Sequence, residues 1–258
     1  MGQHYTIESG LAALYAPSYR YYIGLAIIMI CFYLYYWNGI RQGFKHKTAG
    51  MPWQVNMYNF ANDCIYVIPG FSLWWGKNSP NANFMTKFLW VGLVIWFIME
   101  FFVHYQTIKW DLDKIFPNIR GRVNQILAYV GVQLVFIAGY GFLWNCMDDP
   151  FVWIMFGTTV PNCLNFYFRM MHVNGSTRGI HKTTPWGLLF ANFACFFLWL
   201  PAAGPAMSNF YTYFVGVCEV GVAIAFIIMY NKTPKYVPSD DIKPEMFEEA
   251  EELTDATA

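Results

Sequence analysis

The chain has 258 residues, of which 57% are hydrophobic, 21% aromatic and only 12% charged. Soluble domains carry about twice that charged fraction, so the composition excludes an ordinary soluble domain and indicates a protein that crosses a membrane several times. The formal net charge is zero, so the chain lacks the overall positive charge that would attract nucleic acid. The six scattered cysteines lack the spacing of a zinc site or a disulfide framework, and we expect neither a metal nor another cofactor.

Apolar runs near or above about 18 residues, the length that spans a bilayer, predict an all-α bundle of seven transmembrane helices. In chain order, the predicted helices are 20–38, 53–75, 86–108, 123–144, 151–171, 185–203 and 207–230. They form one transmembrane domain, 20–230. The segment 1–19 is predicted to be extracytoplasmic or interfacial, and 231–258 to be an acidic, solvated tail.

The distribution of basic residues predicts how the bundle is oriented. Lys and Arg lie in the first, third and fifth loops and at the start of the tail, whereas the second loop has only Lys77 and the fourth and sixth have none. Because basic loops stay on the cytoplasmic side, we expect an integral, multi-pass protein with its N-terminus outside and its C-terminus in the cytoplasm.

Three acidic residues interrupt the predicted spans: Asp63, Glu100 and Glu219. A charged side chain at the bilayer centre costs at least about 2.5–3.5 kcal/mol, so such residues face the bundle interior. Asp63 follows Pro52 by eleven residues and Glu219 follows Ser208 by eleven, which places each about 16 Å from its end of the membrane. The sequence therefore predicts that Asp63 and Glu219 meet near the midplane and line one chamber.

Other polar residues recur at helical spacing and share these inward faces. They form four rows: Asn56, Asn59 and Asp63; Trp96, Glu100 and His104; Gln125, Tyr129 and Gln133; and Thr158, Asn162, Asn165 and Arg169. Such groups also tie helices together, at about 0.6 kcal/mol for each hydrogen bond. An ion pair between Glu100 and His104 remains an alternative to a chemical role. Deep aromatics such as Trp96 and Trp199 either pack or stabilise a developing cation.

Three stretches are similar to one protein family. "AGMPWQVNMYNFANDCIY" resembles the second-helix signature of the integral-membrane terpene cyclases of fungal meroterpenoid and indole-diterpene biosynthesis. "NGSTRGIHKTTPWGLLFANF" resembles their Gly-Ser-Ser-Arg-Gly loop, and "GVCEVGVAI" resembles their last helix. The positions that match are Met51, Pro52, Asn59, Ala61, Tyr66, Gly175, Ser176, Arg178 and Gly179. Asp63 stands at the family's Glu and Glu219 at its Asp, while the Trp-Glu pair of the family is Asn62-Asp63 here.

The resemblance implies a seven-span enzyme that cyclises a lipophilic epoxy-prenyl substrate within the membrane. Carried across, Asp63 would donate the proton that opens the epoxide, with Glu219 as its partner. Arg178, in the fifth loop, would hold an anionic head group or a polar ring, unless the loop's charge serves only as a topology signal. The candidate substrate-binding residues are Asn59, Asn62, Tyr66, Trp96, Glu100, Asn162, Arg178 and Trp199.

Two other classes of function use the same polar faces. A proton-coupled transporter would employ the same buried acids but favours internal repeats, and we see none. An accessory subunit would seal its polar stripes against partner helices of a membrane complex. A retinal protein is excluded because the last helix has no Lys for a Schiff base, and a haem protein would depend on His104. We therefore predict an enzyme without a redox cofactor that performs an acid-triggered cyclisation or isomerisation.

Overall fold

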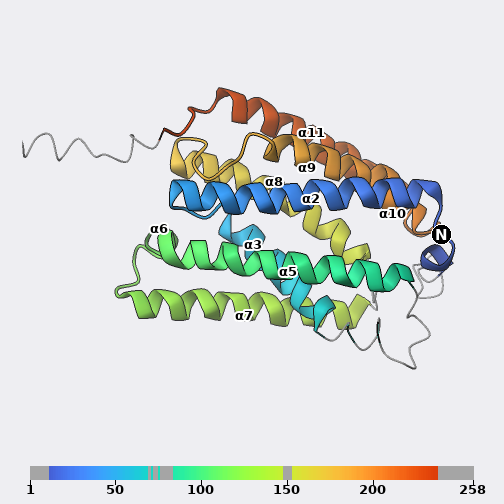
Figure 1. The fold of residues 1–258 in the computed structure, drawn as a ribbon, viewed down its shortest axis with the longest axis horizontal. Helices are drawn as coiled ribbons and strands as arrows, with labels where there is room; N and C mark the ends of the chain where they lie inside the picture. Colours follow the sequence, from blue (N-terminus) through green and yellow to red (C-terminus); the bar gives the residue numbers. More distant parts are fainter. Residues whose placement is uncertain (1–11, 69–70, 72–74, 76–83, 148–152, 238–258) are drawn as a thin grey trace, which may run out of the picture.

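The computed structural model describes residues 12–68, 71, 75, 84–147 and 153–237, and every regular element in these residues is a helix. The elements, shown in Figure 1, are α2 (Tyr19–His46), α3 (Trp53–Val67), α5 (Phe84–Trp110), α6 (Leu112–Ile115), α7 (Arg122–Met147), α8 (Trp153–Asn174), α9 (Thr184–Ala194), the π-helix η1 (Cys195–Trp199), α10 (Leu200–Ala202) and α11 (Phe210–Lys232). The all-α class predicted from the sequence is confirmed for this part of the chain.

Five helical stretches are long and apolar enough to cross a membrane: α2, α5, most of α7, Thr184–Ala202 and α11. Their outer faces carry large apolar side chains, and on α5 Ile95, Ile98 and Phe102 are each about half exposed. Soluble monomers rarely expose contiguous apolar surface of this extent, which supports a membrane protein. The helices α3 and α8 fall on predicted spans but are not among the five stretches.

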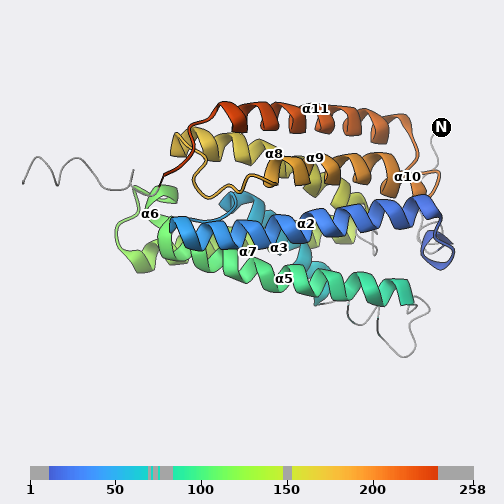
Figure 2. The ribbon, with the colours of Figure 1, turned by 45° about the horizontal axis from the view of Figure 1, so that its top comes forward.

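The helices are arranged around α2, which lies in the middle of the bundle. One face of α2 packs against α9 and η1, and another packs against α5. The helix α11 packs on α9 and α8, whereas α3 packs on α5, α7 and α8. Figures 1 and 2 show α11 and α7 on opposite sides of the bundle. Among the described helices, α8 is the one that packs against both α3 and α11.

The helix α2 continues to His46, eight residues beyond its predicted end at residue 38. Its backbone bonding is unaffected by the polar residues that follow Asn38, since a helix does not have to end where the apolar stretch ends. Lys47 then takes a left-handed conformation, with φ at 48°, and donates its N–H to the carbonyl of Gly43. This reversal turns the chain back along α2 and toward the start of α3.

Asp111, at the end of α5, fixes the turn between α2 and α3. Its carboxylate accepts hydrogen bonds from the Thr48 hydroxyl, at 2.8 and 3.0 Å, and from the backbone N–H of Ala49. Lys114 Nζ lies 3.0 Å from the same carboxylate. A buried carboxylate with several donors is held firmly in place, so Asp111 ties the turn to the α5–α6 junction.

The returning chain approaches α2 so closely that two glycines meet. A Cβ atom added at Gly50 would overlap the carbonyl group of Gly39. Because that neighbour is backbone rather than a flexible side chain, Gly50→Ala is expected to lower stability by about 1–3 kcal/mol, the usual range for overpacking. A thermal melt in detergent would measure the loss. Gly131→Ala on α7, where no atom lies within 4 Å of the added Cβ, is the matched control, and equal melting temperatures for the two variants would contradict the prediction.

The stretch from α9 to α10 contains one widened turn. Residues Cys195–Trp199 form a π-helix, and the N–H of Leu200 reaches the carbonyl of Cys195, five residues back. Pro201 follows directly, and a proline has no N–H and would clash with the preceding turn of a regular helix. The π-turn accommodates the proline without breaking the helix.

Candidate functional site

Two acidic side chains come together where α3 packs along α5. Asp63 is 4% exposed and Glu100 is fully buried. Their carboxyl groups are close enough to interact electrostatically. The pair that the structure assembles is therefore Asp63 with Glu100, one from each of two neighbouring helices.

Tyr36, from the central helix α2, joins the two carboxyls into a network. Its hydroxyl donates to Glu100 Oε1 at 2.7 Å and accepts from the Asn59 side-chain amide at 2.9 Å. Asn62 Nδ2 donates to Asp63 Oδ1 at 3.2 Å. Three helices thus supply one buried cluster, which we call the acid cluster: Tyr36, Asn59, Asn62, Asp63 and Glu100.

The acid cluster has hydrogen-bonding capacity that its own members leave unused. Glu100 Oε2, Asn62 Oδ1 and the adjacent Asn56 Oδ1 are buried and have no hydrogen-bond partner among the described residues. Buried polar atoms are normally paired with protein or with an ordered water. A buried acceptor without a partner can accept a hydrogen bond from a water or from the polar group of a ligand.

No cation balances the acid cluster in the part of the chain that the structure describes. The ion pairs found there are Lys114–Asp111 and Arg122–Asp113, neither of which includes a residue of the cluster. Two unbalanced carboxylates in a low-dielectric interior would be very costly. The arrangement favours a pair that holds at least one proton.

Aromatic rings border the cluster on the α2–α5 side. Trp96, one turn before Glu100 on α5, has its ring centroid 5.6 Å from that of Phe32 and 5.3 Å from that of Tyr33. Tyr33 also interacts electrostatically with Asp63. A ring face beside a buried acid can stabilise a positive charge that forms nearby, and the contacts of Trp96 with Phe32 and Tyr33 fit the alternative packing role equally well.

The predicted pairing of Asp63 with Glu219 is not what the structure assembles. Glu219 lies on α11, which packs against α8 and α9, whereas Asp63 lies on α3, which packs against α5, α7 and α8. None of the interactions of Asp63 within the described residues involves Glu219. Glu219 is 8% exposed and its Oε2 has no partner among those residues. The two acids have the same predicted depth, but they lie on helices that do not pack against each other extensively.

The alternative ion pair between Glu100 and His104 is also absent from the described residues. His104 Nδ1 instead lies 2.7 Å from the Tyr129 hydroxyl, and the edge of its ring meets Phe60. Gln133, on the same helix as Tyr129, donates to the carbonyl of Met57 at 3.1 Å. These contacts join α5 and α3 to α7. They agree with the alternative interpretation of the polar rows, in which such groups hold helices together.

The remaining predicted site residues are spread over the bundle. Tyr66 is buried on α3, one turn beyond Asp63. Trp199 is buried in η1 against Tyr21, at the opposite end of α2 from the first loop. Asn162 lies on α8, and its side chain is outside the described ones. Of these three, Tyr66 is the one that shares a helix with Asp63, Asn59 and Asn62.

Arg178, predicted to contact a substrate, is occupied by contacts within the protein. Its guanidinium donates to the carbonyl of His46 at the end of α2, at 3.0 Å from Nη2, and lies over the ring of Tyr236. The N–H of Thr177 donates to Pro234 at 3.0 Å, and the Thr177 hydroxyl accepts from Tyr236 N. The fifth loop thus anchors residues 233–237 of the predicted tail, while residues 238–258 lie outside the described residues.

Sequence reasoning missed Tyr36 as a member of the site. The residue lies in an aromatic-rich apolar run, "FYLYYW", where a tyrosine is indistinguishable from packing or from an interfacial belt. Its spacing to Phe32 and Gly39, both on the buried face of α2, signals that it points inward. Only the packing of α2 on α5 shows which acid its hydroxyl meets.

Comparison with known proteins gives no assignment. No family model matches the chain, and no curated protein or solved structure matches it significantly.

Proposed function

We propose that this chain is a membrane-embedded acid–base enzyme that protonates and isomerises a lipophilic, prenyl-type substrate, in the manner of the integral-membrane terpene cyclases its sequence resembles. The observation that carries the proposal is the acid cluster. It contains two buried carboxyls, from α3 and α5, that form no ion pair with any described residue, and some of its acceptor atoms have no hydrogen-bond partner there. Such an arrangement is costly as an adhesive between helices, which favours a chemical role.

The carboxyl pair supports both ends of an acid-triggered reaction. Two neighbouring carboxyls of which one is protonated consist of an acid and a base. The acid gives its proton to an epoxide oxygen, the C–O bond breaks, and a carbocation forms that the next double bond of the prenyl chain attacks. A carboxylate then removes a proton from the carbon next to the final cation. The proton count of the enzyme is restored, and the product is an isomer of the substrate.

The neighbours of the pair have roles consistent with this chemistry. Asn62 orients the Asp63 carboxyl through its hydrogen bond, and Tyr36 does the same for Glu100. Asp63 is the proposed proton donor, as the resemblance implies, and Glu100 is the proposed base. Trp96 provides a ring face for the developing cation. The polar amides Asn56 and Asn59 line the same stretch of α3.

The membrane topology of the proposed enzyme follows the sequence prediction. We place the acid cluster inside a bundle of seven spans, in which α3 and α8 cross the membrane together with the five longer stretches. On α3, the polar side chains of Asn56, Asn62 and Asp63 are all buried against neighbouring helices. The N-terminus is outside and the C-terminus cytoplasmic, since the basic loops gather at one end.

The proposal is tested by incubating membranes that contain the full chain with prenylated aromatic compounds that carry a terminal epoxide. We expect liquid chromatography with mass spectrometry to reveal a new product of unchanged mass, absent from control membranes. If no compound in a panel of farnesyl and geranylgeranyl epoxides is converted, the cyclase proposal fails. Proton flux through liposomes of the purified protein, without isomer formation, would instead assign the acid cluster to a proton relay.

A further inference from the structure

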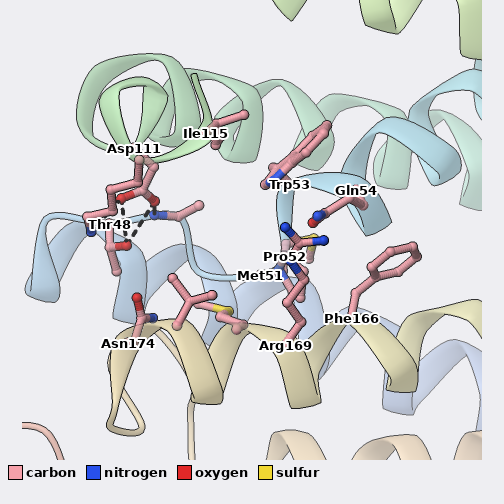
Figure 3. A pocket seen from close by; sticks show the side chains of 14 residues that line it. Thr48, Met51, Pro52, Trp53, Gln54, Asp111, Ile115, Phe166, Arg169 and Asn174 are labelled. Carbon is pink, nitrogen blue, oxygen red and sulfur yellow. Dashed lines mark hydrogen bonds and ion pairs between the residues drawn. The ribbon is translucent and has the colours of Figure 1, made fainter. Parts of the chain in front are cut away.

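A second polar site lies at the end of the bundle that carries the basic loops. A cavity of about 140 Å³ opens between the start of α3, the short helix α6 and the last turns of α8. Figure 3 shows its lining, with Arg169 extending from α8 toward the turn that contains Pro52 and Gln54. The acid cluster lies deeper, along α3 and α5, and none of its members lines this cavity.

The charges around the cavity leave one cation unbalanced. The lining contains Asp111, Lys114 and Arg169. Asp111 is already engaged by Lys114, by the Thr48 hydroxyl and by the N–H of Ala49. Arg169 forms no ion pair or hydrogen bond with any described residue, so the cavity carries a net positive charge that its own walls do not neutralise.

Further donors face the same space. Gln54 lines the cavity and its side-chain amide forms no hydrogen bond within the described residues. The helix α3 begins here, after Pro52, without a side-chain cap on its first turn. The free N–H groups of a first helical turn favour a negative charge, and they add to the charge of Arg169.

The lining of the cavity also contains apolar side chains. They are Met51, Trp53, Phe166, Met170 and Val173, of which Val173 is 62% exposed. A phosphate ion alone would leave these apolar side chains without a partner. An amphiphile would place its charged head against Arg169 and its hydrocarbon chain against the apolar side chains. Arginines near helix ends commonly extend to the membrane–water interface, where such head groups lie.

We propose that this cavity binds the phosphate group of a single-headed anionic amphiphile, a phosphatidic acid or a prenyl phosphate, through Arg169. The guanidinium pairs with two phosphate oxygens, the geometry that arginine favours, and Gln54 with the first turn of α3 completes the site. This site is separate from the acid cluster and does not depend on the proposed catalytic activity.

The test compares Arg169→Gln with Arg120→Gln in the purified full chain in detergent. Arg120 is an exposed cation of the third loop that does not line the cavity. Binding of dihexanoyl phosphatidic acid, farnesyl monophosphate, inorganic phosphate and uncharged dihexanoylglycerol is measured by calorimetry. A charged hydrogen bond is worth about 1.5–3 kcal/mol, so Arg169→Gln should weaken amphiphile binding at least about tenfold. Arg120→Gln should change it less than about twofold.

The outcomes separate the possible sources of the phosphate. Whichever amphiphile binds more tightly to the wild-type chain is the class of ligand, and Arg169→Lys should retain part of its affinity. Equal weakening by Arg120→Gln would show a diffuse charge effect and overturn the site. Inorganic phosphate or dihexanoylglycerol binding as tightly as the amphiphiles would also overturn it. Arg169 makes no hydrogen bond or ion pair with the described residues, and a thermal melt of each variant confirms that it is folded.

Discussion

Asp63→Asn is expected to reduce turnover by about 10²–10⁴-fold, the usual contribution of a general acid or base, and to leave thermal stability equal or higher. The amide keeps the size of the side chain and an oxygen that accepts from Asn62. It removes one of two buried carboxyls for which the described residues supply no cation, and neutralising such a group is often stabilising. Product formation from the epoxide substrates and a thermal melt of the same preparation are the two measurements.

Two further amide substitutions locate the second carboxyl. Glu100→Gln keeps the acceptor for the Tyr36 hydroxyl and is expected to lose turnover as severely as Asp63→Asn. Glu219→Gln changes a carboxyl on α11 that also forms no ion pair with a described residue, and it is expected to retain activity within about threefold. If Glu219→Gln is as inactive as Asp63→Asn while Glu100→Gln is active, the pairing in the acid cluster is wrong and the pairing predicted from the sequence is restored.

Asp111→Ala is expected to destabilise the protein by about 1–3 kcal/mol, the usual cost of leaving buried hydrogen-bond donors without their acceptor. The substitution leaves the Thr48 hydroxyl and the N–H of Ala49 without an acceptor and Lys114 without its partner. Because these bonds fix the turn that leads into α3, the start of that helix should loosen with them. Denaturant titration of the detergent-solubilised protein would measure the change.

Asp113→Ala is the matched control for that prediction. Asp113 lies two residues further along the chain, is 81% exposed at its side chain, and pairs with Arg122 at 3.8 Å. An exposed ion pair contributes about 0–1 kcal/mol, so the control should be nearly as stable as the parent. Equal losses for Asp111→Ala and Asp113→Ala would show that the carboxylate of Asp111 does not hold the turn.

The positions of the helices along the chain could be predicted, because long apolar runs separated by polar loops determine them. The inward direction of Asp63 and Glu100 could also be predicted, since a mid-membrane carboxylate is too costly toward lipid. Their pairing could not. Counting residues from a helix end gives depth along the membrane normal and contains no information about which helices are neighbours.

The same limit explains the prediction for Glu219. The sequence predicts the same depth for Glu219 as for Asp63, yet α11 packs against α8 and α9 rather than against α3. Arg178 shows a different limit. Its sequence context suggested either a topology signal or a contact with substrate, and the structure gives it a third role, as a bridge from the end of α2 to the segment after α11.

The π-turn at Cys195–Trp199 sets the angular position of everything that follows it in the stretch. One residue of an α-helix corresponds to about 100° of rotation, so excising a single residue from this turn would restore regular winding and swing the downstream residues by that angle. Trp199 and Leu200, now buried beside α2, would be carried toward the lipid. The extra residue of the π-turn therefore corrects the rotation of the helix and keeps the Trp199 indole inside the bundle.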